Sequence, residues 1–136
     1  MNTINKTADV KDTKMVLSTL WLFAMLNYLY ADVFTLFFNP GAQGTTLAMP
    51  AGAVMGFAVL METAIAMVLL SRVLKYGVNR WANIVAGIIH TALVVWAHTS
   101  GTPPAPVAVF FATIEAACTL FIIWYAWRWR NPQGQP

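Results

Sequence analysis

Asn27-Tyr28-Leu29-Tyr30-Ala31-Asp32 is a polar stretch inside an apolar run over residues 15–38. At ~1.5 Å per residue, a helix over this run is long enough to cross the ~30 Å hydrocarbon core of a bilayer. Amide, phenol and carboxyl groups are expensive in hydrocarbon, so within a span they face protein or a water-filled cavity. The stretch therefore predicts a membrane span that carries part of a functional site.

Three further apolar segments follow, over residues 51–74, 81–97 and 105–127, and they are separated by stretches with Pro, Gly or basic residues. Of the 136 residues, 59% are hydrophobic and only 10% are charged. This composition is typical of integral membrane proteins. We expect an all-α fold, a four-transmembrane-helix bundle over residues 15–130, with a cytoplasmic tail at 1–14 and a C-terminal tail at 131–136.

The basic residues predict the topology. All eight Lys and Arg, at positions 6, 11, 14, 72, 75, 80, 128 and 130, fall on one side of a four-span arrangement. The positive-inside rule then places both termini in the cytoplasm. We expect a multi-pass protein of the bacterial inner (cytoplasmic) membrane, whose first span is retained because its apolar run is too long for a signal peptide. The net charge of +3 does not indicate a nucleic-acid partner, since no Lys/Arg cluster with interleaved aromatics lies along an exposable face.

Four of the ionisable or amide groups fall in one layer of the predicted bundle. At ~1.5 Å per residue, Asn27 lies ~18 Å from the cytoplasmic end, Glu62 ~13 Å, His90 ~14 Å and Glu115 ~18 Å. Asp32 lies ~26 Å from that end by the same rise, near the outer interface. Three of the five acidic residues of the chain are thus inside spans. We expect Asn27, Tyr30, Glu62, His90 and Glu115 to line one closed pocket that opens outward past Tyr28 and Asp32.

The residue types in this layer suit acid–base chemistry. Ionisable groups in a low-dielectric cavity can differ widely in proton affinity, so that one acts as acid while another acts as base. The predicted catalytic residues are Glu62, His90, Glu115 and Asp32, and the predicted substrate-binding residues are Asn27, Tyr28, Tyr30 and Asn83. The alternative is that the polar groups only join helices through hydrogen bonds, above all Asn27 and Asn83. His98 is expected to be a surface residue.

A metal or cofactor is not expected. His90, Glu62 and Glu115 would suit zinc or iron, but the Glu-x-x-His spacing of di-iron bundles is absent. His90 and His98 are two turns apart on one helix, which disfavours haem with two axial histidines. The single Cys118 excludes an intramolecular disulfide and a dithiol redox pair, and we expect it to pack in the core.

Several segments resemble a known family. They are Leu17-Ser18-Thr19-Leu20-Trp21, the stretch over residues 27–32, and the region from Glu62-Thr63-Ala64-Ile65-Ala66-Met67 through Asn79-Arg80-Trp81-Ala82-Asn83-Ile84. They resemble a bacterial family of small four-helix membrane proteins known only as a domain of unknown function, and this family is distantly similar to the DoxX-type group. The resemblance implies the four-helix fold. It implies no catalytic residue, because the activity of the family is not established.

Three functions fit these observations. The first is an intramembrane enzyme, an isomerase, cyclase or hydrolase, that acts on a small lipophilic substrate. The second is a proton-coupled small-molecule transporter. The third is an accessory or binding subunit of a membrane complex, for example one that binds a quinone. The expected partners are membrane lipids and a small lipophilic ligand, with a homo-oligomer left open.

Overall fold

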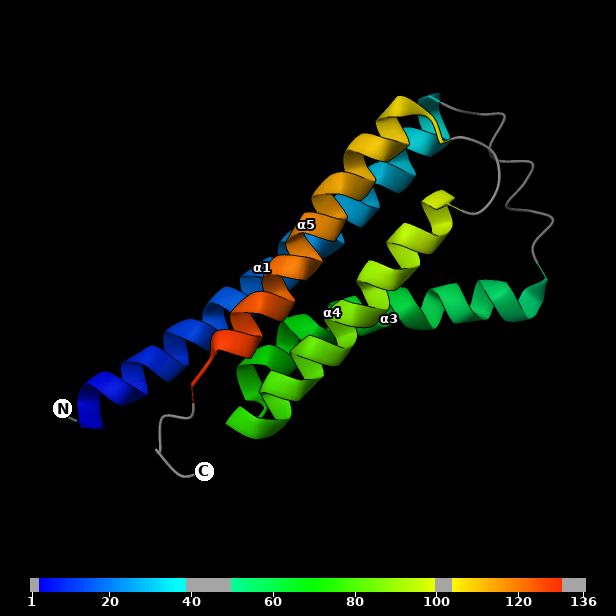
Figure 1. Ribbon diagram of the computed structural model, residues 1–136. Coiled ribbons are helices and arrows are strands. Elements are labelled where there is room, and N and C mark those ends of the chain that lie inside the picture. The colour runs from blue at the N-terminus through cyan, green and yellow to red at the C-terminus, as the bar shows by residue number, and fades with distance from the viewer. Residues whose placement is uncertain (1–2, 39–49, 100–103, 131–136) are drawn as a thin grey trace.

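The computed structural model describes residues 3–38, 50–99 and 104–130, and all of its regular structure is helical (Figure 1). The helices are α1 (Thr3–Phe38), α3 (Ala51–Val73), α4 (Tyr76–Thr99) and α5 (Pro106–Arg128). Within the described residues, each of the four is long and apolar enough to cross a membrane. The predicted all-α fold with four membrane-spanning helices is confirmed. The cytoplasmic location of the termini remains a prediction.

The helix ends follow the local sequence, with two differences from the predicted boundaries. Pro50 precedes α3 and accepts a 2.8 Å hydrogen bond from the backbone N–H of Ala53, and Pro106 is the first residue of α5. Proline suits a helix start because its missing N–H has no partner there in any case. However, α1 begins at Thr3 and not near residue 15, and α4 begins at Tyr76 and not at residue 81. Both extensions are more polar than the apolar windows that set the predicted boundaries.

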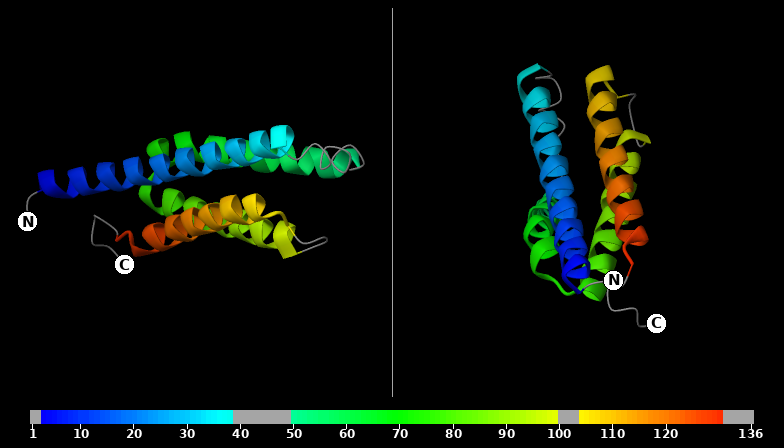
Figure 2. Two further views of the ribbon diagram at one scale, coloured as in Figure 1. Left: turned by 90° about the horizontal axis from the view of Figure 1, so that it is seen from above. Right: turned by 90° about the vertical axis from the view of Figure 1, so that its left-hand side faces the viewer.

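The helices form a closed ring in which α1 contacts α3 and α5, and α4 contacts α5 and α3. α1 and α5 run antiparallel and side by side (Figures 1 and 2). Leu17, Trp21 and Ile122 are fully buried in the core. α4 and α5 approach closely at Gly87, where an added Cβ would lie 2.7 Å from Cγ1 of Ile123.

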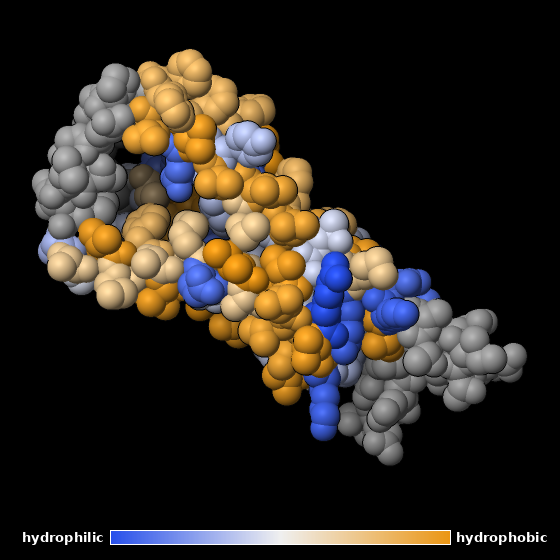
Figure 3. Space-filling view, turned by 180° about the vertical axis from the view of Figure 1, so that it is seen from behind, coloured by the Kyte–Doolittle hydropathy of each residue, from blue (hydrophilic) through white to orange (hydrophobic). Residues whose placement is uncertain are grey.

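The two ends of the bundle differ. We call the end that holds the start of α1, the end of α5 and the connection from α3 to α4 the basic end, because the described Lys and Arg residues lie there. On the face shown in Figure 3, the surface is mainly hydrophobic and large hydrophilic side chains gather toward that end. At the opposite end the first half of α3 diverges from α1 (Figure 1), and every residue over 51–59 is exposed. The bundle is therefore tightly packed at the basic end and looser at the other.

Candidate functional site

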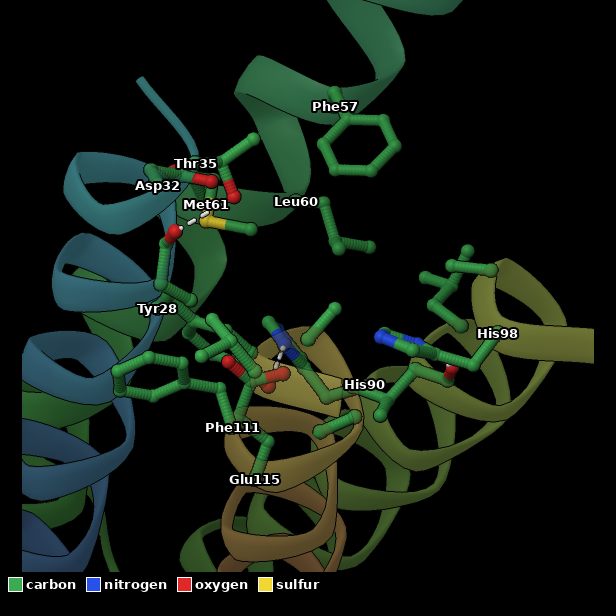
Figure 4. A pocket seen from close by; sticks show the side chains of 17 residues that line it. Tyr28, Asp32, Thr35, Phe57, Leu60, Met61, His90, His98, Phe111 and Glu115 are labelled. Atoms are coloured by element: carbon green, nitrogen blue, oxygen red, sulfur yellow. Dashed lines mark hydrogen bonds between the residues drawn. The ribbon is translucent and has the colours of Figure 1, made fainter. Parts of the chain in front are cut away.

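A pocket of about 210 Å³ lies between all four helices in the half of the bundle away from the basic end (Figure 4). This volume is several times the ~30 Å³ that one water molecule occupies in the liquid. Most of its lining is apolar, with Phe57, Leu60 and Met61 from α3 and Phe111 from α5. The polar lining residues are Tyr28, Asp32, Thr35, His90, His98 and Glu115. The pocket thus combines apolar walls with a few polar groups, as small-molecule sites commonly do.

His90 lies at the base of the pocket and is held by two rings of α1. It is only 1% exposed. The hydroxyl oxygen of Tyr28 lies 3.2 Å from Nδ1 of His90, and the ring of Trp21 meets the imidazole edge-on, with centroids 5.3 Å apart. The other nitrogen, Nε2, is buried and has no hydrogen-bond partner among the described residues. A buried polar atom without a partner is costly, so Nε2 is suited to bind a polar atom of a ligand.

Glu115 of α5 is also buried and lines the pocket. The side-chain amide of Asn27 donates to Oε1 of Glu115 at 3.4 Å and to the carbonyl oxygen of Phe111 at 3.2 Å. Asn27 itself is not a lining residue. Its amide therefore orients the carboxyl group from behind, while the carboxyl group faces the same cavity as His90.

The far rim of the pocket carries Asp32 and Thr35 of α1 and His98 of α4 (Figure 4). Nδ1 of His98 lies 2.8 Å from the carbonyl oxygen of Val94. Because a carbonyl oxygen can only accept, Nδ1 carries the hydrogen, and Nε2 of the neutral ring is an acceptor. The expectation that His98 is only a surface residue is wrong: it is half-buried and lines the pocket. The sequence did contain a signal for this position: His98 lies two turns after His90 on the same helix, so both can face the same side.

Four predicted site residues do not line this pocket: Asn27, as described above, and also Tyr30, Glu62 and Asn83. Tyr30 is 59% exposed on α1, and Glu62 is exposed on α3 directly after the lining residue Met61. Adjacent residues on a helix point about 100° apart, so depth alone did not fix which side chain faces inward. Asn83 is buried, but it lies nearer the basic end and does not line the pocket. Of the five residues predicted to line one pocket, His90 and Glu115 do so, whereas Asn27, Tyr30 and Glu62 do not.

Asn83 is instead the centre of a buried hydrogen-bonded cluster with Trp21, Ser71 and Asn79, which we call the Asn83 network. Its Oδ1 accepts from Nε1 of Trp21 at 2.7 Å and from the hydroxyl of Ser71 at 3.2 Å. Its Nδ2 donates to the backbone oxygen and Oδ1 of Asn79 at 2.8 and 2.7 Å. Asn79 in turn donates to the backbone oxygen of Ser71 at 2.6 Å. The network joins α1, α3 and α4, which supports the alternative that Asn83 joins helices.

A family of unknown function, DUF6326, matches residues 6–134. The chain belongs to the DUF6326 family. No curated protein and no solved structure matches this DUF6326 chain. The predicted resemblance to an uncharacterised family is confirmed, whereas the distant similarity to the DoxX-type group remains a prediction.

Two smaller expectations concern metal and cysteine. Among the described residues of this DUF6326 chain, no group of three or more His, Cys, Asp or Glu side chains could hold a metal ion. In particular, the proposed set of His90, Glu62 and Glu115 does not come together, because Glu62 faces outward. Cys118 is buried in the core and its thiol donates to the carbonyl oxygen of Leu20 at 3.4 Å. The predicted packing position of Cys118 is therefore confirmed.

Proposed function

We propose that this protein is an intramembrane enzyme that moves a proton on a small lipophilic substrate, with Glu115 and His90 as the acid–base groups. One observation carries the proposal: Nε2 of the buried His90 has no partner among the described residues, and His90 lines the same apolar pocket as Glu115. Ionisable groups inside a span usually mark a functional site. An acid and a base in one desolvated pocket are what proton-transfer catalysis requires.

The pocket lining defines the class of substrate. Phe57, Leu60, Leu93 and Phe111 offer apolar contacts, so most of the substrate is hydrocarbon. When the Tyr28 hydroxyl donates to Nδ1 of His90, Nε2 carries the hydrogen and donates to an oxygen of the substrate. A lipophilic ketone, enone or ester has such an oxygen. We propose that its carbonyl group lies at the base of the pocket and its hydrocarbon part extends toward α3.

We propose an isomerisation, because this reaction needs no co-reactant besides the substrate and the side chains of the pocket. The carboxylate of Glu115 removes a proton from the carbon next to the carbonyl group, and the electron pair moves to the carbonyl oxygen, which accepts a hydrogen bond from Nε2 of His90. The same carboxyl group then returns the proton to another carbon of the conjugated system, so that atoms and electrons balance without a co-reactant. A positioned general base typically contributes ~10² to 10⁴ in rate.

The proposal is tested with the lipophilic molecules that co-purify from native membranes. The bound molecules are identified by mass spectrometry and incubated with fresh protein in deuterated water. Wild type should introduce deuterium at a carbon position. Glu115→Gln should retain binding but slow the exchange by ~100-fold or more. Glu62 lies outside the pocket, so Glu62→Gln should introduce deuterium at the wild-type rate. Recovery of a bound molecule without carbon-bound deuterium would contradict an enzymatic role.

Proton-coupled transport is the second candidate, because ionisable groups occur at two levels of the pocket, Asp32 at the rim and Glu115 at the base. In that case the bound molecule should pass through proteoliposome membranes chemically unchanged. Its flux should follow the pH gradient in wild type and lose that dependence in Glu115→Gln. A molecule that binds without either deuterium exchange or flux would indicate a binding subunit.

A further inference from the structure

The carboxyl group of Glu62 has no hydrogen-bond or ion-pair partner among the described residues. This residue lies in the middle of α3, and its side chain is exposed. The described Lys and Arg residues lie at the basic end and not at the level of Glu62. Because a carboxyl group facing hydrocarbon is costly, such residues usually face protein. The side chain therefore requires a partner from outside this chain.

Glu62 lies on an exposed and otherwise apolar face of α3. The face consists of Ala51, Met55, Ala58, Glu62, Ile65 and Leu69, all exposed, and we call it the Glu62 face. Its members recur at alternating intervals of four and three residues, which is the repeat of coiled-coil seams. Met55 and Leu69 are 66% and 67% exposed. These intervals place all six residues along one side of α3, so a second helix that lies along this side would contact Glu62.

We propose that a second copy of this chain packs on the Glu62 face, with the two α3 helices parallel and the two Glu62 side chains opposite each other. All copies insert in the same orientation, so a two-fold axis along the membrane normal brings each residue of the face to its counterpart at the same depth. Ala51 and Ala58 allow the backbones to approach, as small residues do in membrane helix pairs. One carboxyl group donates a hydrogen bond and the other accepts it, as in paired carboxyl groups that share one proton.

The pairing also explains why α3 can diverge from its own bundle. Every residue over 51–59 is exposed in the single chain, yet Phe57 in this segment forms part of the pocket wall. A parallel α3 from the partner supports this segment from outside. The pairing rests on the Glu62 face alone and does not depend on the proposed catalytic function.

Cysteine cross-linking tests the pairing in native membranes. Single cysteines at Met55 and Leu69, in a Cys118→Ser background, should form disulfide-linked dimers under mild oxidation. Matched controls are single cysteines at Val85 of α4 and Phe121 of α5, which are 50% and 44% exposed on other helices. These controls should remain monomeric. Equal cross-linking at all four positions, none at Met55 and Leu69, or cross-linking of Leu69→Cys to a different protein would overturn the proposal.

The role of Glu62 is tested by the dimer dissociation constant, measured by energy transfer between labelled copies in bilayers. Glu62→Ala should weaken the dimer about threefold to thirtyfold, the range expected for an interhelical hydrogen bond in a membrane. Glu62→Gln should stay within about threefold of wild type, because an amide can both donate and accept. An unchanged dissociation constant in Glu62→Ala would contradict the carboxyl pairing. The pocket residues are untouched, so ligand binding measured in the same samples reports separately on the proposed function.

Discussion

Two polar contacts join α1 to α4, and they differ in how completely their atoms are bonded. Trp21 donates to Asn83 in the Asn83 network, and one heptad later on both helices the Tyr28 hydroxyl meets His90. All four residues are buried. At Asn83 the amide oxygen and nitrogen are both bonded, whereas at His90 one ring nitrogen has no partner among the described residues. The first contact is fully hydrogen-bonded among the described residues, whereas the second leaves Nε2 of His90 without a partner there.

The difference follows from the packing around each contact. The Asn83 network receives polar groups from α3 as well as α1, because Ser71 lies where α3 is buried. At the level of His90, α3 contributes Met61, Leu60 and Phe57 to a cavity in place of a polar partner. The divergence of α3 thus turns a second structural contact into a candidate binding site.

The largest expected effect comes from breaking the Asn83 network. Asn83→Leu leaves Trp21, Ser71 and Asn79 without their partner, and buried groups left unpaired cost roughly 1–3 kcal/mol each in water and less in membranes. We expect the free energy of unfolding to fall by about 2–4 kcal/mol. The matched variant His90→Leu should lose less, about 1 kcal/mol, because it leaves only the Tyr28 hydroxyl without its partner. Reversible unfolding in bilayers or mixed micelles measures both, and equal losses would contradict the comparison.

A smaller effect is expected at Gly87, which lies between Asn83 and His90 on the buried face of α4. Its Cα faces Ile123 so closely that any side chain must displace Ile123. Gly87→Leu should cost about 1–3 kcal/mol through overpacking. A double-mutant cycle tests this contact. In an Ile123→Ala background, Gly87→Leu should lower the free energy of unfolding by less than it does in the wild-type background. Additive effects would show that the close approach of α4 and α5 does not set the packing between the two contacts.

The smallest effect on stability is expected at Tyr28. Tyr28→Phe keeps the ring but removes the contact to Nδ1 of His90, which should cost about 0.5–1 kcal/mol. Without that contact the imidazole is free to place its hydrogen on either nitrogen. The ¹⁵N signals of His90 in labelled protein should therefore shift in Tyr28→Phe, while the side-chain amide signals of Asn83 should stay in place. Unchanged His90 signals would show that Tyr28 does not orient the ring.

The sequence was sufficient to predict four spans, because each is a long apolar segment bounded by Pro, Gly or basic residues. The depths estimated from the sequence also placed His90, Glu115, Asn27, Tyr28 and Asp32 in one region of the bundle. The structure agrees, because the helices that carry these residues meet there. Glu62 was misplaced because the rotation of α3 depends on packing, and the small residues of that helix give no strong apolar face. The start of α4 was missed because Tyr76 and Asn79 precede the apolar window.

The Asn83 network was only partly foreseeable. A structural role for Asn83 was one of two predicted alternatives, and Asn79 lies one turn before it on the same helix. The bond to Trp21 could not be predicted, because it depends on how α1 and α4 are aligned across the bundle. The same alignment sets which nitrogen of His90 meets Tyr28, so the lack of a partner for Nε2 was visible only in the structure.

A crystal structure of protein extracted from native membranes, without delipidation, tests the central claim most directly. The account predicts an elongated ligand between the four helices, with an oxygen atom about 2.7–3.2 Å from Nε2 of His90 and hydrocarbon against Phe57 and Phe111. It also predicts no foreign molecule within the Asn83 network. A pocket filled by its own side chains, or a ligand whose polar atoms avoid both His90 and Glu115, would contradict the account.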